Sequence, residues 1–234
     1  MGLMQLRQAV IGVSEVEPAA IQLRKELGLA KGFADPLLAE IGMDDESLVL
    51  GDHLSFLEFV APMRDDVSLA RWLAKGGGPG RYALSIQVDD VEPYLARMAE
   101  LGLGVAGDVV AYGYRLVQLL PKQIGLLLEL DEVPDPKAWF WDSIDKEYPA
   151  DPQVDSFTSL ELTSPDPAAQ SAVWGALFDV PVSADHTIHL GDLPVSFVEG
   201  PRAMMSGIGL ARSADSRLAA GSSLTLDGVR FDIS

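Results

Sequence analysis

The sequence of 234 residues predicts an α+β fold built from a repeated β-α-β-β-β unit. Each occurrence of this unit is called a copy. Two predicted helix starts, Val13–Pro18 and Val88–Pro93, share a valine, acidic residues and a proline, and they lie 75 residues apart. A third helix start has its proline at Pro167, 74 residues after Pro93. Self-similarity at a fixed period indicates that each copy is one structural unit.

Three stretches read as the last strand of a copy, and each ends with a carboxylate. In Gly51–Pro62 (GDHLSFLEFVAP), period-two alternation places Glu58 on the same face as Leu54 and Phe56. A carboxylate on an apolar face is costly unless something pairs with it. The corresponding residues of Gly125–Pro134 and Gly191–Pro201 are Glu129 and Glu199.

The first copy opens with a buried strand and then a helix that starts near Ser14 and ends at Gly28. Acidic residues and a proline are typical of a first helical turn, where amide donors are unpaired and the helix dipole favours negative charge. A short helix and a glycine-rich link then lead to the second copy. The remaining elements expected here are Leu6–Val13, Leu37–Ile41, Ser47–Leu50 and Leu54–Val60 as strands, Val67–Lys75 as a helix and Gly76–Gly80 as the link.

The later copies repeat this order, and the fourth is abbreviated. Four copies imply two paired domains, over residues 1–135 (copies 1–75 and 76–135) and 154–234, joined by a Pro- and aromatic-rich linker over 136–153. The strands expected in these copies are Tyr82–Val88, Val109–Tyr112, Tyr114–Leu120, Ile124–Leu130, Phe157–Thr163, Thr187–Leu190, Val195–Glu199, Met205–Leu210, Ser223–Leu226 and Val229–Ile233, with a short helix at Ala214–Ala220.

Composition narrows the class of protein. The net charge is −18 and the sequence pI is about 4.3, a surface that repels nucleic acid and anionic lipid. The chain has no cysteine, which excludes disulfides and thiolate metal ligands. No secretory signal is evident, and no apolar run approaches the roughly 20 residues that a membrane helix needs. We therefore expect a cytoplasmic protein that binds a small molecule, as a monomer or a homodimer.

The repeated copies, their strand-end glutamates, the Val-Asp-Asp-Val-Glu helix start and the Glu-Leu-Gly helix end resemble the vicinal oxygen chelate superfamily. That superfamily includes glyoxalase I, methylmalonyl-CoA epimerase, extradiol dioxygenases and bleomycin-binding proteins. The resemblance implies glyoxalase-like domains, in which two copies form a cleft of curved mixed sheets. It also implies a divalent metal in the cleft, to which the substrate binds through two adjacent oxygens.

The ligand positions that this resemblance implies are only partly filled here. The first-strand positions correspond to Gln8 and Ala83, and the last-strand positions to Glu58 and Glu129. An alanine has no donor atom, and a site without a nitrogen ligand is less suited to zinc. The implied cofactor is therefore a divalent metal (Mg, Mn, Ni or Zn, with Mg²⁺, Mn²⁺ or Ca²⁺ favoured by the oxygen ligands) or none.

The three histidines restrict the chemistry further. Neither first-strand position holds histidine, so the two-histidine iron site of extradiol dioxygenases is excluded. His53 is expected to be structural and to point to the other face of the sheet from Glu58. If a bulge forms near Pro194, His189 and Glu199 lie on the same face, where they could form an acid–base or metal-binding pair in a second cleft. Without the bulge, His189 is a histidine at the edge of a hairpin.

Two functions from different classes stay open. In the first, Glu58 and Glu129 meet with Gln8 in an apolar cleft and abstract a proton beside a carbonyl, as a lyase, isomerase or epimerase. In the second, the chain is a metal-free drug- or metabolite-binding protein. A third interpretation assigns no function to these residues. In it, Glu58 and Glu129 are solvated strand ends, and the aromatic residues of the linker only pack the linker against the domains. The residues expected to line the cleft are Leu54, Phe56, Leu127, Trp139 and Trp141.

Overall fold

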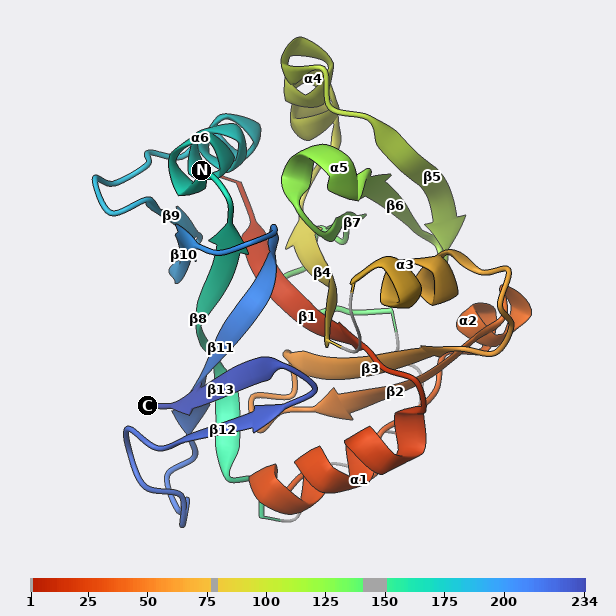
Figure 1. Cartoon of the computed structure of the whole chain (residues 1–234), viewed down its shortest axis with the longest axis vertical. Coiled ribbons are helices and arrows are strands. Elements are labelled where there is room, and N and C mark those ends of the chain that lie inside the picture. The colour runs from red at the N-terminus through yellow and green to blue at the C-terminus, as the bar shows by residue number, and fades with distance from the viewer. Residues whose placement is uncertain (1, 77–79, 141–150) are drawn as a thin grey trace. The chain divides into compact units, whose positions relative to one another are not determined.

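The computed structural model describes residues 2–76, 80–140 and 151–234 and confirms the α+β class with mixed sheets (Figure 1). The first copy comprises β1 (Met4–Gly12), α1 (Val16–Leu27), α2 (Pro36–Glu40), β2 (Met43–Val49), β3 (Phe56–Pro62) and α3 (Ser68–Gly76). The second comprises β4 (Gly80–Val88), α4 (Glu92–Leu101), β5 (Val105–Ala111), β6 (Tyr114–Leu119), α5 (Pro121–Ile124) and β7 (Leu127–Glu132).

The third and fourth copies are shorter. The third comprises β8 (Val154–Ser164), α6 (Pro167–Phe178), β9 (Thr187–Leu190) and β10 (Leu193–Glu199), and the fourth comprises β11 (Met204–Arg212), β12 (Ser223–Leu226) and β13 (Val229–Ile233). No described helix is long and apolar enough to cross a membrane.

The strand register confirms the predicted duplication. β1 pairs with β3 in parallel, and Gln8 lies opposite Phe56, two residues before Glu58. β4 pairs with β7 in the same way, and Ala83 lies opposite Leu127, two residues before Glu129. The alignment of Gln8 with Ala83 and of Glu58 with Glu129 therefore follows from backbone pairing.

Two local predictions were wrong. Leu37–Ile41 is not a strand, because Pro36 fixes a first helical turn and the Asp35 carboxylate caps it by accepting from Leu37 N at 2.8 Å. An isolated antiparallel bridge between Phe33 and Ser47 lies before this helix. Residues 214–220 form turns instead of a short helix.

The chain divides into two compact units that each combine distant segments. Unit 1 holds Met1–Arg7, Ala83–Ile144 and Ser159–Gly207, and unit 2 holds Gln8–Tyr82, Asp145–Thr158 and Ile208–Ser234. The division into domains over 1–135 and 154–234 stays a prediction.

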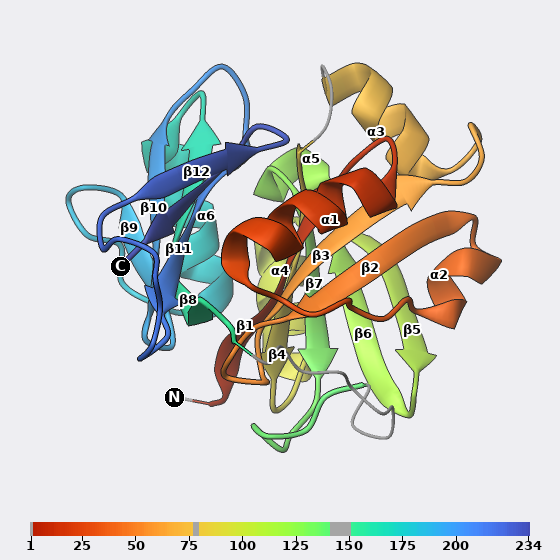
Figure 2. The same cartoon turned by 90° about the horizontal axis from the view of Figure 1, so that it is seen from below.

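Unit 2 has the strand orders β2-β3-β1 and β12-β13-β11. Helix α1 lies along β2 and β3, as Figures 1 and 2 show, and buries Ala20 and Leu23 on that side. Arg24 of α1 forms a 3.1 Å ion pair with Glu46 of β2. The face of β2 and β3 that carries Glu46 is therefore the helix-covered face.

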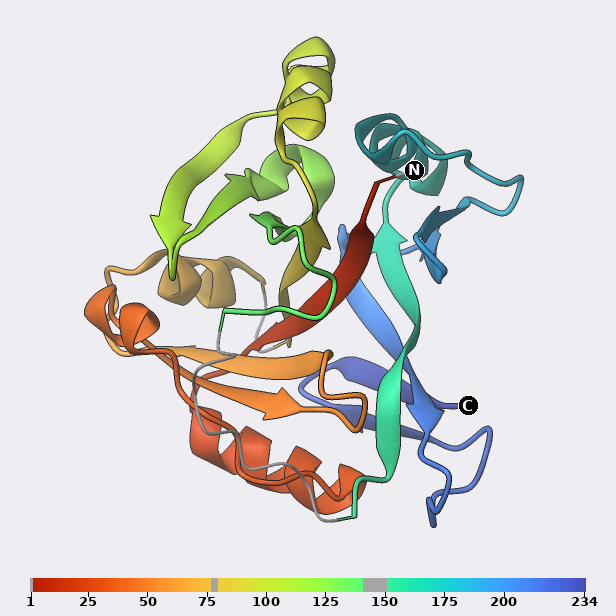
Figure 3. The same cartoon turned by 180° about the vertical axis from the view of Figure 1, so that it is seen from behind.

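Unit 1 has the strand orders β4-β7-β6-β5 and β8-β10-β9. Helices α4 and α6 pack together through Tyr94 and Phe178, whose ring centroids are 5.8 Å apart (Figure 3). The Arg97 Nε atom donates to Leu177 O at 2.6 Å, and the fully buried Trp174 donates from Nε1 to Ile124 O at 3.1 Å. These contacts fix the helical side of unit 1.

Candidate functional site

The face of β1 and β3 that α1 leaves uncovered in unit 2 carries a buried polar pair. Gln8 and Glu58 expose only 5% and 6% of their surface. The Gln8 Nε2 atom donates to Glu58 Oε2 at 2.7 Å. The structure thus brings together two of the residues singled out from the sequence, and the hydrogen bond satisfies one oxygen of the buried carboxylate.

Strand β2 adds two polar residues to this face that the sequence analysis missed. Ser47 lies directly opposite Glu58 in the antiparallel ladder, and Asp45 lies opposite Val60. Paired residues share a face, and diagonal neighbours lie about 7–8 Å apart. Ser47 is fully buried, and its Oγ atom has no hydrogen-bond partner within the described ranges. Asp45, Ser47 and Glu58 therefore form one buried polar row with Gln8, which we call the β2–β3 polar row.

Asp45 is a carboxylate of this row whose pKa is raised by its surroundings. Burial raises the pKa of Asp45 to about 7, and the neighbouring carboxylates of Asp35, Asp44 and Glu46 act in the same direction. The backbone N–H of Asp35 opposes the shift by donating to both carboxylate oxygens, at 2.9 and 3.0 Å. The period of two in a strand was the available signal, because in MDDESLV it places Asp45 on the face of Ser47.

Aromatic and branched side chains surround the polar row. Phe33 contacts Phe56 edge to face, with ring centroids 6.3 Å apart. Val10 and Val60 share the same face by register. Leu54 precedes β3 and is half-buried, in a turn held by Asp52, which accepts from Leu54 N and Ser55 N. The surroundings are thus mostly apolar, which strengthens electrostatic interactions in the row.

Unit 1 carries the second predicted glutamate. Glu129 is half-buried and accepts a hydrogen bond from Gln118 Nε2 at 2.6 Å. Leu127 shares its face and is also half-buried, and Ala83 contributes no donor there. Ser85 Oγ donates to the buried Asp131. The relation of Glu129 to Glu58 stays a prediction, because the two residues belong to different compact units.

Trp139 packs within unit 1 against a buried arginine. The Arg7 guanidinium lies 5.4 Å from the Trp139 ring centroid and donates to Gln87 Oε1 at 2.5 Å and Pro136 O at 2.6 Å. Trp139 exposes 2% of its surface and contacts Phe140. This geometry supports the interpretation that Trp139 packs the linker against the rest of the unit and does not line a cleft. Trp141 lies outside the described residues.

His189 and Glu199 are not brought to one face by the ladder. His189 lies directly opposite Pro194, and the pairing continues regularly to Thr187 and Ser196 without the bulge that the prediction required. Alternation therefore places His189 on the face of Ser196 and Glu199 on the face of Phe197. Both side chains are exposed. His53 is also exposed, in the turn before β3 with φ of 61°.

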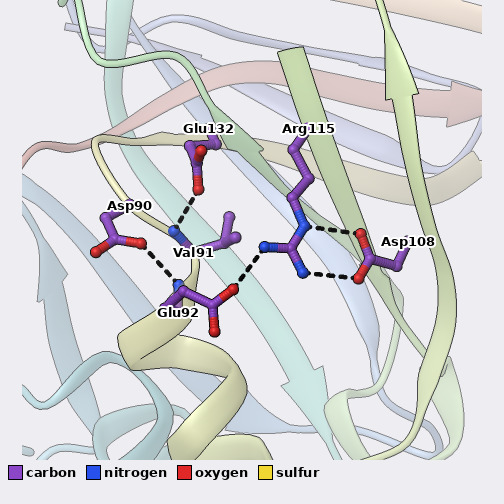
Figure 4. Close-up of polar contacts among 6 residues, drawn as sticks. All are labelled: Asp90, Val91, Glu92, Asp108, Arg115 and Glu132. Atoms are coloured by element: carbon purple, nitrogen blue, oxygen red, sulfur yellow. Dashed lines mark hydrogen bonds and ion pairs between the residues drawn. The ribbon is translucent and has the colours of Figure 1, made fainter.

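A separate charged cluster lies at the start of α4 (Figure 4). Arg115 of β6 donates to both carboxylate oxygens of Asp108, at 2.9 and 2.8 Å, and to Glu92 at 2.7 Å. The hydrogen bond from Arg115 lowers the pKa of Asp108. Glu132 accepts from Val91 N at 3.0 Å. These carboxylates are engaged by donors of the chain itself, so the cluster serves the fold.

Metal ligands are sparse in both units. No group of three or more His, Cys, Asp or Glu side chains in the described residues is arranged to hold a metal ion. Within unit 2, the β2–β3 polar row offers one amide, one hydroxyl and two carboxylates. Gln8 and Glu58 hydrogen-bond each other, and both Asp45 oxygens accept from the backbone N–H of Asp35. Mg²⁺ and Ca²⁺ take six or more oxygens, and catalytic zinc takes three protein ligands. The donor set of this unit alone does not fit a divalent cation.

Comparison with known proteins adds evidence on the fold. No protein-family model and no curated protein matches the sequence. A hypothetical protein from Staphylococcus aureus matches with a TM-score of 0.69 and 8% identity over 99% of both chains. A methylmalonyl-CoA epimerase from Streptomyces coelicolor, in complex with 2-nitronate-propionyl-CoA, matches 55% of this chain and 96% of its own, with 25% identity and a TM-score of 0.48. The Mycobacterium tuberculosis epimerase matches 54% of this chain and 85% of its own, with 22% identity and a TM-score of 0.47.

Proposed function

We propose that the chain is a glyoxalase-like isomerase that moves a proton beside the carbonyl of a small substrate. The observation that carries the proposal is the β2–β3 polar row, where Asp45, with a pKa of about 7, lies on one buried face with Ser47 and Glu58. A general base works best when its pKa lies near the working pH. Perturbed carboxylates in apolar surroundings are typical of such sites.

Each residue of the row has a distinct role in this proposal. The Asp45 carboxylate takes a proton from the carbon next to the carbonyl. Ser47 Oγ donates a hydrogen bond to the carbonyl oxygen, on which negative charge develops. Glu58, held by Gln8, orients the substrate through a polar group on its other side. Return of the proton to the opposite face of that carbon gives an epimer, return to the same face regenerates the substrate, and return to a neighbouring carbon gives an isomer.

The metal-assisted form of this function would add Gln8, Glu58 and Glu129 as ligands. Since the donors of unit 2 alone do not fit a divalent cation, the proposed steps use only the side chains of the row. Glu129 stays a second candidate for the base, and its hydrogen bond from Gln118 mirrors the bond from Gln8 to Glu58.

Hydrogen exchange in D₂O tests the proposal without knowledge of the exact product. The chain is incubated with a panel of acyl-thioesters and hemithioacetals, and deuterium at the carbon next to the carbonyl is measured by mass spectrometry. We expect exchange by the wild type and a loss of about 100-fold in Asp45→Asn. Glu199→Gln, an exposed strand-end control, retains the wild-type rate. Exchange that is equal in Asp45→Asn and the wild type would refute the role of Asp45.

A metal-free binding protein is the second candidate, because Ala83 supplies no ligand and the half-buried Phe33, which packs on Phe56, offers aromatic surface. Thermal-shift measurements with cationic aromatic compounds test it. Stabilisation that Phe33→Leu weakens, together with no deuterium uptake by any substrate in the panel, would favour binding over catalysis.

A further inference from the structure

The β2–β3 polar row is closed off from solvent in this structure. Ser47 exposes none of its surface, and Asp45 and Glu58 expose 5% and 6%. A molecule that reacts with Asp45 and Ser47 must touch both side chains, so part of the chain has to move before such a molecule can enter. Access to the row therefore requires a segment that opens.

The segment between α1 and α2 covers the row at Ser47, and we call its residues 31–35 the strap. Phe33 of the strap forms the antiparallel bridge with Ser47, and directly paired residues have their side chains on the same face of a sheet. The Phe33 ring also contacts the ring of Phe56, which lies on β3 two residues before Glu58 and on the same face. The half-buried Phe33 therefore reaches across the edge strand β2 on the face that carries Ser47.

Hydrogen bonds fasten the strap to β2 on both sides of this bridge. The two bridge residues exchange backbone hydrogen bonds at 3.3 and 2.9 Å. The Gly32 N–H donates to Glu46 Oε1 at 2.8 Å, and the Asp35 N–H donates to both carboxylate oxygens of Asp45, at 2.9 and 3.0 Å. The carboxylate that acts as the base in the proposed reaction is thus also one of the groups that hold the strap closed.

The strap and α2 have few anchors in the core. No residue of α2 is buried, and Leu37 and Ile41 expose 38% and 56% of their surface. Figures 1 and 2 show α2 beside the start of β2. Glycines with positive φ lie at both ends of this part of the chain, with φ of 66° at Gly28 and 82° at Gly42. Segments with few buried apolar contacts open at the lowest free energy, and small residues are common at hinges.

We propose that the strap is a gate of the β2–β3 polar row, which moves away from β2 on hinges near Gly28 and Gly42 and lets a small molecule reach Ser47. Opening separates the Asp35 N–H from the Asp45 carboxylate, so the base gains a free oxygen in the state that admits the substrate. The inference rests on the proposed function for the identity of the entering molecule, whereas the gate itself is measured by access to position 47.

A cysteine at the covered position measures the opening, since the chain has no cysteine of its own. The Ser47→Cys thiol can react with a chromogenic disulfide reagent only after the strap has moved. Ser55→Cys is the matched reporter, because Ser55 is 3% exposed and lies in the turn before β3 of the same unit. Each rate is divided by the rate of the same variant unfolded in urea. We expect Ser47→Cys to react at least about 10-fold faster than Ser55→Cys, although position 47 is the more deeply buried.

Gly32→Ala opens the gate from the strap itself. A methyl group at position 32 would overlap the carbonyl oxygen of Ser47 in the closed arrangement, whereas the open strap accommodates it. We expect Gly32→Ala to speed the reaction of the Ser47→Cys thiol by about 10-fold and to leave that of the Ser55→Cys thiol unchanged. Phe33→Ala removes the cover and should act in the same direction, with circular dichroism confirming that each variant is folded.

Equal rates for the two reporters, rising equally in low urea, would show that Ser47 is reached only when unit 2 unfolds, and would overturn the gate. It would also be overturned if Gly32→Ala and Phe33→Ala speed both reporters to the same extent. Selective reaction of the Ser47→Cys thiol, in a protein whose wild type takes up no deuterium into any substrate of the panel, would support the gate and contradict the catalytic proposal alone.

Discussion

Gln8 Nε2 donates to Glu58 Oε2 at 2.7 Å although 50 residues separate the two in the chain. The contact follows from the parallel pairing of β1 with β3, which sets both side chains on the face that α1 leaves uncovered. Burial makes this bond matter, because an amide or carboxylate without a partner away from water costs more than the bond contributes. The pair therefore fixes the position of the glutamate at the centre of the β2–β3 polar row.

Removal of the amide is expected to destabilise unit 2. Gln8→Ala takes one donor from the buried Glu58 carboxylate and should lower the free energy of unfolding by about 1–3 kcal/mol in urea titrations. Gln123→Ala is the matched control, since the Gln123 side chain bonds exposed backbone at Gly102 and Gly104. An unchanged urea midpoint in Gln8→Ala would show that the bond to Glu58 contributes nothing.

Arg7 is expected to be the most sensitive charged residue of unit 1. It is fully buried, stacks near Trp139 and donates to Gln87 and Pro136. Arg7→Met leaves these acceptors without their donor, and we expect a loss of about 3 kcal/mol in the free energy of unfolding. Arg64→Met provides the comparison, because the Arg64 side chain is 57% exposed. Equal urea midpoints for the two variants would contradict this role of Arg7.

Substitution of Asp35 tests the stability of α2, the helix found where a strand was predicted. Its carboxylate caps α2 by accepting from Leu37 N. Asp35→Ala removes the cap and should cost about 1 kcal/mol, whereas Asp35→Ser should retain most of the stability. Hydrogen exchange at the amide of Leu37 would rise in the alanine variant alone. If serine and alanine behave alike, the cap is unimportant.

The stability of the protein should fall as the pH rises towards 7 because of Asp45. The folded pKa of about 7 lies above the ordinary aspartate value of 3.8, so the stabilising contribution of Asp45 is complete below pH 3.8 and is lost as the pH rises through 7. Relative to Asp45→Asn, the wild type should lose about 1.4 kcal/mol per pH unit between pH 4 and 7. Urea titrations at several pH values measure this slope. Asp192→Asn, at an exposed turn residue, should keep the wild-type slope. A flat difference between the wild type and Asp45→Asn would refute the shifted pKa.

The repeat was readable from the sequence because its helix starts, glycine ends and strand-end acids are local signals. Those signals predicted the correspondence of Glu58 with Glu129, and the family resemblance implied that of Gln8 with Ala83. In the strand register, both pairs occupy equivalent positions. The error at Leu37–Ile41 has a local cause. The apolar residues suggested a strand, but Asp35 and Pro36 together specify a capped helical turn.

The rest of the site depends on pairing between strands, which the local sequence does not specify. Asp45 and Ser47 lie beside Glu58 because β2 pairs with β3, and this pairing is not encoded in the sequence of either strand alone. The regular ladder at Pro194 separated His189 from Glu199, since one residue of register exchanges the two faces of a strand. Arg7 looked like an ordinary strand residue, and its burial against Trp139 depends on a segment more than 120 residues away.

The pH dependence of deuterium uptake in D₂O, measured for the wild type and for Asp45→Asn on the best substrate of the panel, tests the central claim most directly. The proposal predicts a rate that rises through an inflection near pH 7 in the wild type, as Asp45 becomes the free base, and no such inflection in the variant. A profile with the same inflection and the same rate in both proteins would contradict it.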